Sequence, residues 1–236
     1  MRQILPVVLV AATVLVAAPA TAEPRDRGVP LGRQVLAPND GWAAEGAGTT
    51  GGSAAPKENV HVVDTRAGLV AALAAPAPKI IYVRGTIDGN TDDAGDPLTC
   101  ADYAAPGYSL AEYLATYDPA VWGRETEPAG PLEDARAASA ANQSEHIRLK
   151  VGSDTTIVGA GRHAVLKGLN LHVDRADNVI VRNLTFVDAA DCFPRWDPTD
   201  GTAGEWNSLY DNVSVTGSTH VWVDHNTFTD GDNPDS

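Results

Sequence analysis

Two stretches near the carboxyl end of the chain repeat one another and decide the fold. Residues 178–189 read N-V-I-V-R-N-L-T-F-V-D-A, and residues 220–231 read H-V-W-V-D-H-N-T-F-T-D-G. At a constant offset of 42 residues, five positions are identical: Val179 with Val221, Val181 with Val223, Thr185 with Thr227, Phe186 with Phe228 and Asp188 with Asp230. A solenoid stacks each strand on the strand of the previous coil, so such a register is expected. The repeat predicts a parallel β-helix.

A shorter match points the same way but has another spacing. Residues 177–179 align with residues 211–213 at an offset of 34 residues, which we interpret as a coil with a loop of different length. In this arrangement Phe186 is expected to stack inside the coil. Asn183 and His225 occupy equivalent places at a turn, where their side chains can hydrogen-bond backbone groups of adjacent coils.

The rest of the chain fits a turn-rich β protein with some helix. Short apolar runs, rich in β-branched residues, end at Gly, Asn or Asp and predict successive strands. They cover residues 59–63, 79–83, 147–151, 155–158, 164–166, 169–173, 179–181, 184–186, 213–215 and 221–223. Three helices are predicted: a short capping helix at 66–73 after Thr65, with Leu69, Val70 and Leu73 on one face, a short helix at 109–116, and an alanine-rich helix at 131–142. The second lies in a partly helical insertion over 90–127.

The first residues are typical of an export signal. Arg2 is followed by an apolar run at 4–18 and by the sequence Pro-Ala-Thr-Ala at 19–22. The run is short for a membrane span of about twenty residues, so a membrane anchor is disfavoured. The predicted organisation is a signal peptide at 1–22, a flexible amino terminus at 23–36 and a β-helix domain over 37–236. We therefore expect a secreted, extracellular protein.

The two cysteines and the charge narrow the function. Outside the cell, Cys100 and Cys192 would be in an oxidising compartment, where they can pair as a disulfide or stay unpaired.

The net charge of -14, from 17 basic and 31 acidic residues, argues against nucleic-acid binding. Residues 188–236 hold ten acidic residues and a single base, Arg195. A solvated surface accounts for part of this cluster, whereas Ca²⁺ binding, which uses carboxylate and carbonyl oxygens, accounts for the rest. Zinc is disfavoured because His and Cys ligands are sparse.

Several longer motifs resemble one enzyme family. They are the repeat itself, D-C-F-P-R-W-D-P-T-D-G at 191–201, E-W-N-S-L-Y-D-N-V-S-V at 205–215, N-D-G-W at 39–42, G-T-T-G-G at 48–52 and V-R-G-T-I-D at 83–88. Over about residues 37–236, the sequence resembles the amino-terminal part of secreted bacterial pectate lyases of the pectate lyase C superfamily. The V-W-V-D-H-N-T-F block within the repeat is the most specific of these motifs.

The resemblance implies a right-handed parallel β-helix, a Ca²⁺ cofactor and cleavage of polygalacturonate by β-elimination. It implies that Asp211, in the W-N-S-x-Y-D motif, is a Ca²⁺ ligand, and that Asp200, in P-T-D-G, helps to bind substrate. Asp224 is expected to be structural. The family's H-D-G-x-x-D motif and its catalytic arginine would follow Ser236, so no base is assigned within the chain. We therefore expect an incomplete and inactive fragment of an enzyme that is a monomer at full length and binds no membrane.

Two other function classes stay open. One is a different β-helix enzyme, a pectin lyase or a polygalacturonase. The H-G motif of polygalacturonases is absent, and the one N-T-D-D run, at 90–93, which includes the pair Asp92 with Asp93, lies outside the repeats. The other class is a non-catalytic, pectin-binding β-helix protein.

Overall fold

The computed structural model describes residues 30–231. Its strands are β1 (Val60–Val63), β2 (Lys79–Val83), β3 (Thr86–Asp88), β4 (Arg148–Val151), β5 (Thr155–Gly159), β6 (Val165–Lys167), β7 (Asn170–Asp174), β8 (Asp177–Arg182), β9 (Thr185–Val187), β10 (Arg195–Asp197), β11 (Glu205–Asn207), β12 (Val213–Thr216), β13 (Thr219–Asp224) and β14 (Thr227–Thr229). Its helices are α1 (Arg66–Ala74), α2 (Cys100–Tyr103), α3 (Leu110–Thr116), α4 (Pro119–Trp122) and α5 (Pro131–Ile147), with 3₁₀ turns η1 (Leu31–Arg33), η2 (Trp42–Ala44) and η3 (Lys57–Asn59).

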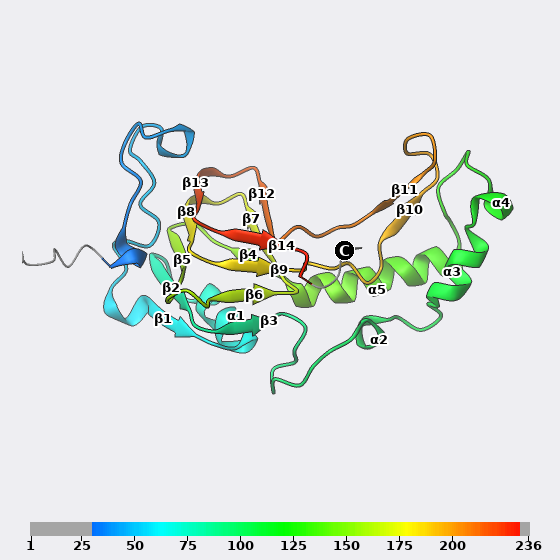
Figure 1. Ribbon diagram of the computed structural model, residues 1–236, viewed down its shortest axis with the longest axis horizontal. Coiled ribbons are helices and arrows are strands. Elements are labelled where there is room, and N and C mark those ends of the chain that lie inside the picture. The colour runs from blue at the N-terminus through cyan, green and yellow to red at the C-terminus, as the bar shows by residue number, and fades with distance from the viewer. Residues whose placement is uncertain (1–29, 232–236) are drawn as a thin grey trace, which may run out of the picture.

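Three parallel sheets wrap around one interior (Figure 1). Their strand orders are β1-β2-β5-β8-β13, β12-β7-β4 and β14-β9-β6-β3. The chain visits the sheets in turn, because β4, β5 and β6 form one coil, β7, β8 and β9 the next, and β12, β13 and β14 the third. The predicted right-handed parallel β-helix is thereby confirmed.

The 42-residue repeat is the stacking register of two coils. Val221 lies opposite Val179 in the β13–β8 pair, and Phe228 lies opposite Phe186 in the β14–β9 pair. The 34-residue match is wrong as a register, because Val213 pairs with Leu171, again 42 residues apart. The same letters, Asp-Asn-Val, begin strands of two different sheets. The preceding pair of coils has a shorter offset, since Leu171 lies opposite Leu149. The later coil is longer because it contains residues 188–212.

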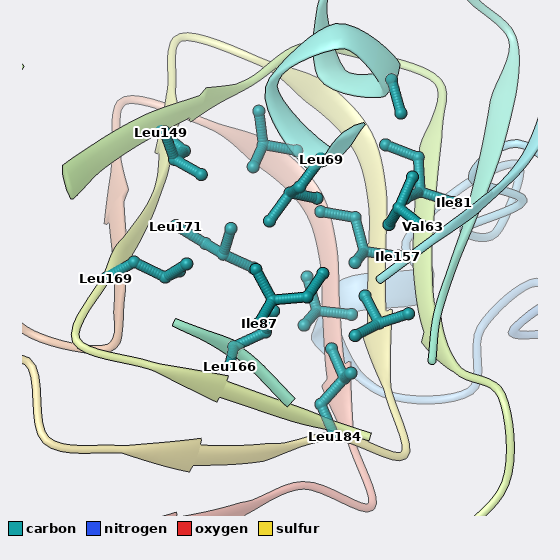
Figure 2. Close-up of a cluster of buried hydrophobic side chains, with 14 of the residues drawn as sticks. Val63, Leu69, Ile81, Ile87, Leu149, Ile157, Leu166, Leu169, Leu171 and Leu184 are labelled. Carbon is teal, nitrogen blue, oxygen red and sulfur yellow. The ribbon is translucent and has the colours of Figure 1, made fainter. Parts of the chain in front are cut away.

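Side chains along the strands alternate between the two faces, and those on the inner face fill the interior. In β4 the burial pattern alternates exposed and buried, so that Leu149 and Val151 point inward. Leu171 and Phe186 are fully buried. Figure 2 shows aliphatic side chains from all three sheets, among them Leu171, Ile157 and Leu166, converging on one interior. Helix α1 covers one end of the coil with Leu69, which is also fully buried.

Helix α1 begins as predicted, with one difference on its buried face. The Thr65 hydroxyl accepts a hydrogen bond from the Gly68 backbone N–H, which caps the first turn. Leu69 and Leu73 pack on the core, but Val70 is 37% exposed and does not share their face.

The polar turn prediction is confirmed at Asn183. Asn183 has a positive φ of 55°, and its side-chain amide donates to the carbonyls of Gly159 and Gly161 at 3.1 and 3.0 Å. His225 has the same backbone conformation one coil later. Its Nδ1 lies 2.7 Å from a carboxylate oxygen of Asp224, the residue expected to be structural.

Residues between β3 and β4, and between β9 and β12, form a lobe beside the β-helix (Figure 1). Helix α5 extends five residues beyond the predicted range, and β10 pairs with β11 as an antiparallel hairpin that the sequence pattern does not show. A disulfide joins Cys100 in α2 to Cys192 just before β10. The cysteine pairing that the sequence left open therefore ties the two excursions together.

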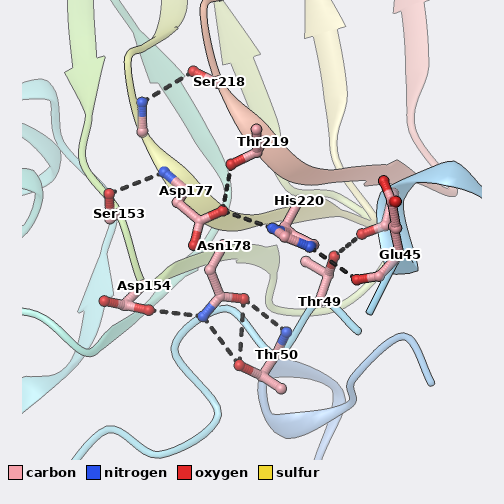
Figure 3. Close-up of polar contacts among 12 residues, drawn as sticks. Glu45, Thr49, Thr50, Ser153, Asp154, Asp177, Asn178, Ser218, Thr219 and His220 are labelled. Carbon is pink, nitrogen blue, oxygen red and sulfur yellow. Dashed lines mark hydrogen bonds and ion pairs between the residues drawn. The ribbon is translucent and has the colours of Figure 1, made fainter. Parts of the chain in front are cut away.

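The amino-terminal segment is fastened to the outside of the coils. Of the stretch predicted to be flexible, 23–36, residues 30–36 are described, and Leu31 packs on the cluster around Ile80. The flexibility of this stretch stays a prediction. Asn178 Oδ1 accepts a hydrogen bond from the backbone N–H of Thr50 at 2.7 Å (Figure 3). It also accepts one from the backbone N–H of Gly51 at 2.7 Å. The predicted signal peptide at 1–22 lies outside the described residues. Within 30–231, no helix is long and apolar enough to cross a membrane.

Candidate functional site

An open hollow of about 420 Å³ lies where the chain enters and leaves the last described coil. Asp211 reaches it directly before β12, and Asp230 reaches it directly after β14. The other residues that line the hollow are Ala189, Ser208, Tyr210, Asn212, Val213 and Phe228. Two carboxylates, 19 positions apart in sequence, are therefore brought to one place because a strand start and a strand end meet at one corner of the β-helix.

The backbone at Asp211 is held while its carboxylate stays exposed. The Asn170 side-chain amide donates to the Asp211 carbonyl and, at 2.8 Å, to the Ser214 hydroxyl. Tyr210 is buried, and its hydroxyl donates to the Ala140 carbonyl at 3.2 Å. Burial raises the pKa of Tyr210, so this hydroxyl keeps its proton. Residues on both sides of Asp211 thus fix its position. The Ser214 hydroxyl also donates to Asp211 Oδ2 at 3.4 Å, while the carboxylate stays exposed toward the hollow.

Polar atoms in the coil beneath the hollow lack partners. Among the described residues, two buried acceptor atoms have no hydrogen-bond partner, Asn170 Oδ1 and Asp188 Oδ1. One buried donor atom, Asn212 Nδ2, also has no partner there. Asn170 lies beneath Asp211, to which it is hydrogen-bonded, and Asp188 lies beneath Asp230 in the repeat. Buried polar groups are nearly always paired, so this corner of the molecule has unmet capacity for polar ligands.

The electrostatics of the hollow favour a cation. No Lys or Arg lines it, and neither Asp211 nor Asp230 takes part in an ion pair within residues 30–231. Two carboxylates without a basic neighbour attract a hard, oxygen-preferring cation. They supply only part of a Ca²⁺ shell. No group of three or more His, Cys, Asp and Glu that could hold a metal ion occurs in the described part of the chain.

Other acidic residues of the 188–231 region are already engaged. Asp191 accepts hydrogen bonds from the backbone N–H groups of Phe193 and Leu209 at 2.8 and 3.0 Å. Hydrogen bonds from Thr199 lower the pKa of Asp197. Asp224 pairs with Arg182 at 2.7 Å. Asp191, Asp197 and Asp224 therefore have structural roles, whereas Asp211 and Asp230 face the hollow.

The sequence-predicted site residues occupy different places. Asp211 lines the hollow, whereas Asp200 is exposed in the turn between β10 and β11 and does not line it. Asp230 is a lining residue that the motifs did not single out. Its signal in the sequence is its match with Asp188 in the repeat, at the end of equivalent strands.

A smaller hollow of about 180 Å³ lies between α3, α4 and the β10–β11 hairpin. Tyr113, Tyr117, Trp196 and Trp206 line it, with Asp118 as its one carboxylate. Asp118 accepts from the Ala120 backbone N–H at 2.7 Å and caps α4, so this carboxylate already has a structural role. The aromatic hollow therefore offers less for chemistry on a charged ligand than the one at Asp211.

Comparisons with known proteins show what this chain is similar to. A family model described as pectate lyase matches residues 129–236. A pectate lyase of Bacillus subtilis (strain 168) is 49% identical over 98% of this chain and 54% of its own length. A solved structure of a pectate lyase bound to hexasaccharide superposes with a TM-score of 0.85 at 50% identity, over 88% of this chain and 52% of the other. A structure concerned with the anti β-elimination mechanism of pectate lyase gives the same values. The chain spans about half the length of the relatives that it matches.

Proposed function

Because this chain belongs to the pectate lyase family, we propose that its protein cleaves polygalacturonate by Ca²⁺-dependent β-elimination. The observation that carries the proposal is the pair of carboxylates, Asp211 and Asp230, that line one hollow with no basic residue in its lining. A polyanionic substrate is repelled by such a site unless cations bridge the two sets of carboxylates.

The residues present fit part of a Ca²⁺ site. Asp211 and Asp230 supply carboxylate oxygens, and the buried acceptor Oδ1 of Asp188 lies in the coil beneath. A Ca²⁺ ion bound there would draw charge from the substrate carboxylate and make the neighbouring C5 hydrogen more acidic. The chain's own contribution is to hold these carboxylates in place, and Asn170 does so by its hydrogen bond to the Asp211 backbone.

The remaining step of β-elimination is proton transfer. A base takes the C5 proton, the C4–O bond breaks, and an unsaturated sugar end forms. None of the arginines within 30–231 lines the hollow, so we assign no base. Asp200, in the β10–β11 turn, keeps its predicted role in substrate binding as part of this proposal.

We also propose that the protein is secreted. The support for export is the apolar run at 4–18 after Arg2, together with the pairing of Cys100 with Cys192. Disulfides persist in oxidising compartments and are rare in the cytosol.

Purified full-length protein should release unsaturated uronate products from polygalacturonate, measured by their ultraviolet absorbance. We expect EDTA to abolish the reaction and added Ca²⁺ to restore it. The variant Asp211→Asn should lose most of the activity. The matched control Asp40→Asn removes an exposed carboxylate far from the hollow in sequence and should leave the activity unchanged.

The outcomes separate the alternatives. Cleavage of methyl-esterified pectin that is insensitive to EDTA would indicate a pectin lyase, and products without a double bond would indicate a hydrolase. Binding of polygalacturonate without any product would indicate a non-catalytic pectin-binding protein. Each of these results would overturn the proposed reaction.

A further inference from the structure

Two cations stand on the outer face of β4, the strand two places away from β12. Arg148 and Lys150 are exposed, and they alternate with the buried residues Leu149 and Val151. Because successive side chains of a strand point to opposite faces, both cations project away from the interior on the same face. His172 lies beside Lys150 on the adjacent strand β7.

These cations are not neutralised by the protein. Within residues 30–231, neither Arg148 nor Lys150 forms an ion pair with a carboxylate. Arg148 Nη2 lies 3.1 Å from His172 Nε2. Burial, together with the charge of Arg148, lowers the pKa of His172, so at neutral pH its ring accepts this hydrogen bond without charge. In contrast, Arg175 on the same sheet pairs with Asp174 at 2.6 Å.

A groove lies directly beside the two cations. Its volume is about 380 Å³, and Arg148 and Lys150 line it together with Val70, Leu73 and Leu149. Two small residues, Ala74 and Gly152, complete the lining. The groove therefore offers an apolar wall from α1 and two positive charges from β4. A uronate ring, with apolar C–H groups and one carboxylate, has the complementary chemistry.

The register connects this groove to the Asp211 site. Arg148 lies opposite Asn170. The Leu171 backbone N–H, next to Asn170 in β7, donates a hydrogen bond to the carbonyl of Asn212. Asn212 directly follows Asp211. Neighbouring strands lie about 4.8 Å apart, and β4 is two strands from β12, which follows Asp211. Arg148 in β4 therefore lies about 10 Å from β12 across the sheet. A chain of several sugars can cover this span.

We propose that Arg148 and Lys150 form an additional subsite that binds the carboxylates of polygalacturonate units lying beyond those at Asp211. This inference rests on the proposed function. In this subsite the protein's cations contact the substrate directly, whereas at Asp211 two protein carboxylates require a bridging metal ion.

The test compares oligogalacturonates of two lengths. Full-length wild-type protein and the double variant Arg148→Gln/Lys150→Gln are titrated calorimetrically with di- and hexagalacturonate in the presence of Ca²⁺. We expect hexagalacturonate to bind about 4- to 25-fold more weakly to the variant, because each exposed ion pair changes an affinity by a factor of roughly two to five. Digalacturonate, which occupies only the Asp211 region, should bind both proteins equally.

A matched control removes the same charge elsewhere. Lys57 and Arg162 are exposed, and Arg162 lies in the turn between β5 and β6. The variant Lys57→Gln/Arg162→Gln should keep the wild-type affinity for hexagalacturonate. An equal loss in both double variants would show a general charge effect and overturn the subsite.

Failure of the subsite can be told apart from failure of the proposed function. If wild-type protein binds hexagalacturonate, Asp211→Asn weakens that binding, and Arg148→Gln/Lys150→Gln does not, the subsite is wrong and the proposed function stands. If wild-type protein binds neither oligosaccharide, the proposed function is wrong, and the subsite is overturned with it.

Discussion

Phe186 offers the strongest test of the stacked interior. Its ring is fully buried and lies parallel to that of Phe228 in the next coil, with centroids 4.9 Å apart and an interplanar angle of 6°. Replacing a buried Phe with Ala costs about 3–5 kcal/mol through lost burial and the cavity that remains. The lost ring pair adds about 0.5–1.5 kcal/mol. We therefore expect Phe186→Ala to lose about 4–5 kcal/mol in free energy of unfolding.

Urea denaturation followed by far-ultraviolet circular dichroism measures this loss, with the disulfide kept intact. In a domain of this size, 1 kcal/mol corresponds to about 2–4 °C, so the melting temperature should fall by about 8–20 °C. The control Trp42→Ala removes a larger aromatic side chain that is 93% exposed, and it should change stability by less than about 0.5 kcal/mol. A loss below about 1 kcal/mol for Phe186→Ala would refute the register and the packing inferred from it.

Three further predictions concern the contacts that fasten loops and turns. Replacing Cys100 and Cys192 by Ser should lower the free energy of unfolding by about 2–4 kcal/mol and remove the sensitivity of the melting temperature to dithiothreitol. Hydrogen bonding to Asp177 raises the pKa of His220 above 6.5. Hydrogen bonds from Thr219 and then from His220 lower the pKa of Asp177 below 3.8. The stabilisation by this pair should be complete between about pH 4 and 6.5 and decline as the pH rises through the raised His220 pKa, so the stability difference between wild type and His220→Ala should shrink at alkaline pH. Asn183→Ala should cost about 2–3 kcal/mol, whereas Asn183→Gly, which tolerates the positive φ, should cost about 1 kcal/mol less by thermal unfolding.

Much of the β-helix was predictable because its interior repeats. Identical residues such as Val179 and Val221 fill the same place in successive coils, so the sequence match and the structural register coincide. The 34-residue match failed because three letters are too few to identify a sheet: Val179 stands in β8, whereas Val213 stands in β12. The β10–β11 hairpin could not be recognised, since each strand has three residues of mixed polarity.

Only part of the candidate site could be predicted from the sequence. The motif around Asp211 pointed to that residue, but its meeting with Asp230 depends on how a full coil returns to the same corner. Likewise, the disulfide partner of Cys100 could be named but not established, because pairing requires that two separate excursions fold against each other. In contrast, the alternation over 148–151 already places Arg148 and Lys150 on one outer face.

A Ca²⁺-binding isotherm of full-length protein tests the central claim most directly. Isothermal titration of the wild type with CaCl₂ should show a saturable site, and Asp211→Asn and Asp230→Asn should each weaken it about tenfold or more, because even residues that only support metal ligands change affinity by 10- to 100-fold. The control Asp40→Asn should bind Ca²⁺ as the wild type does. Wild-type affinity in both hollow variants, or the absence of any Ca²⁺ binding, would contradict the account.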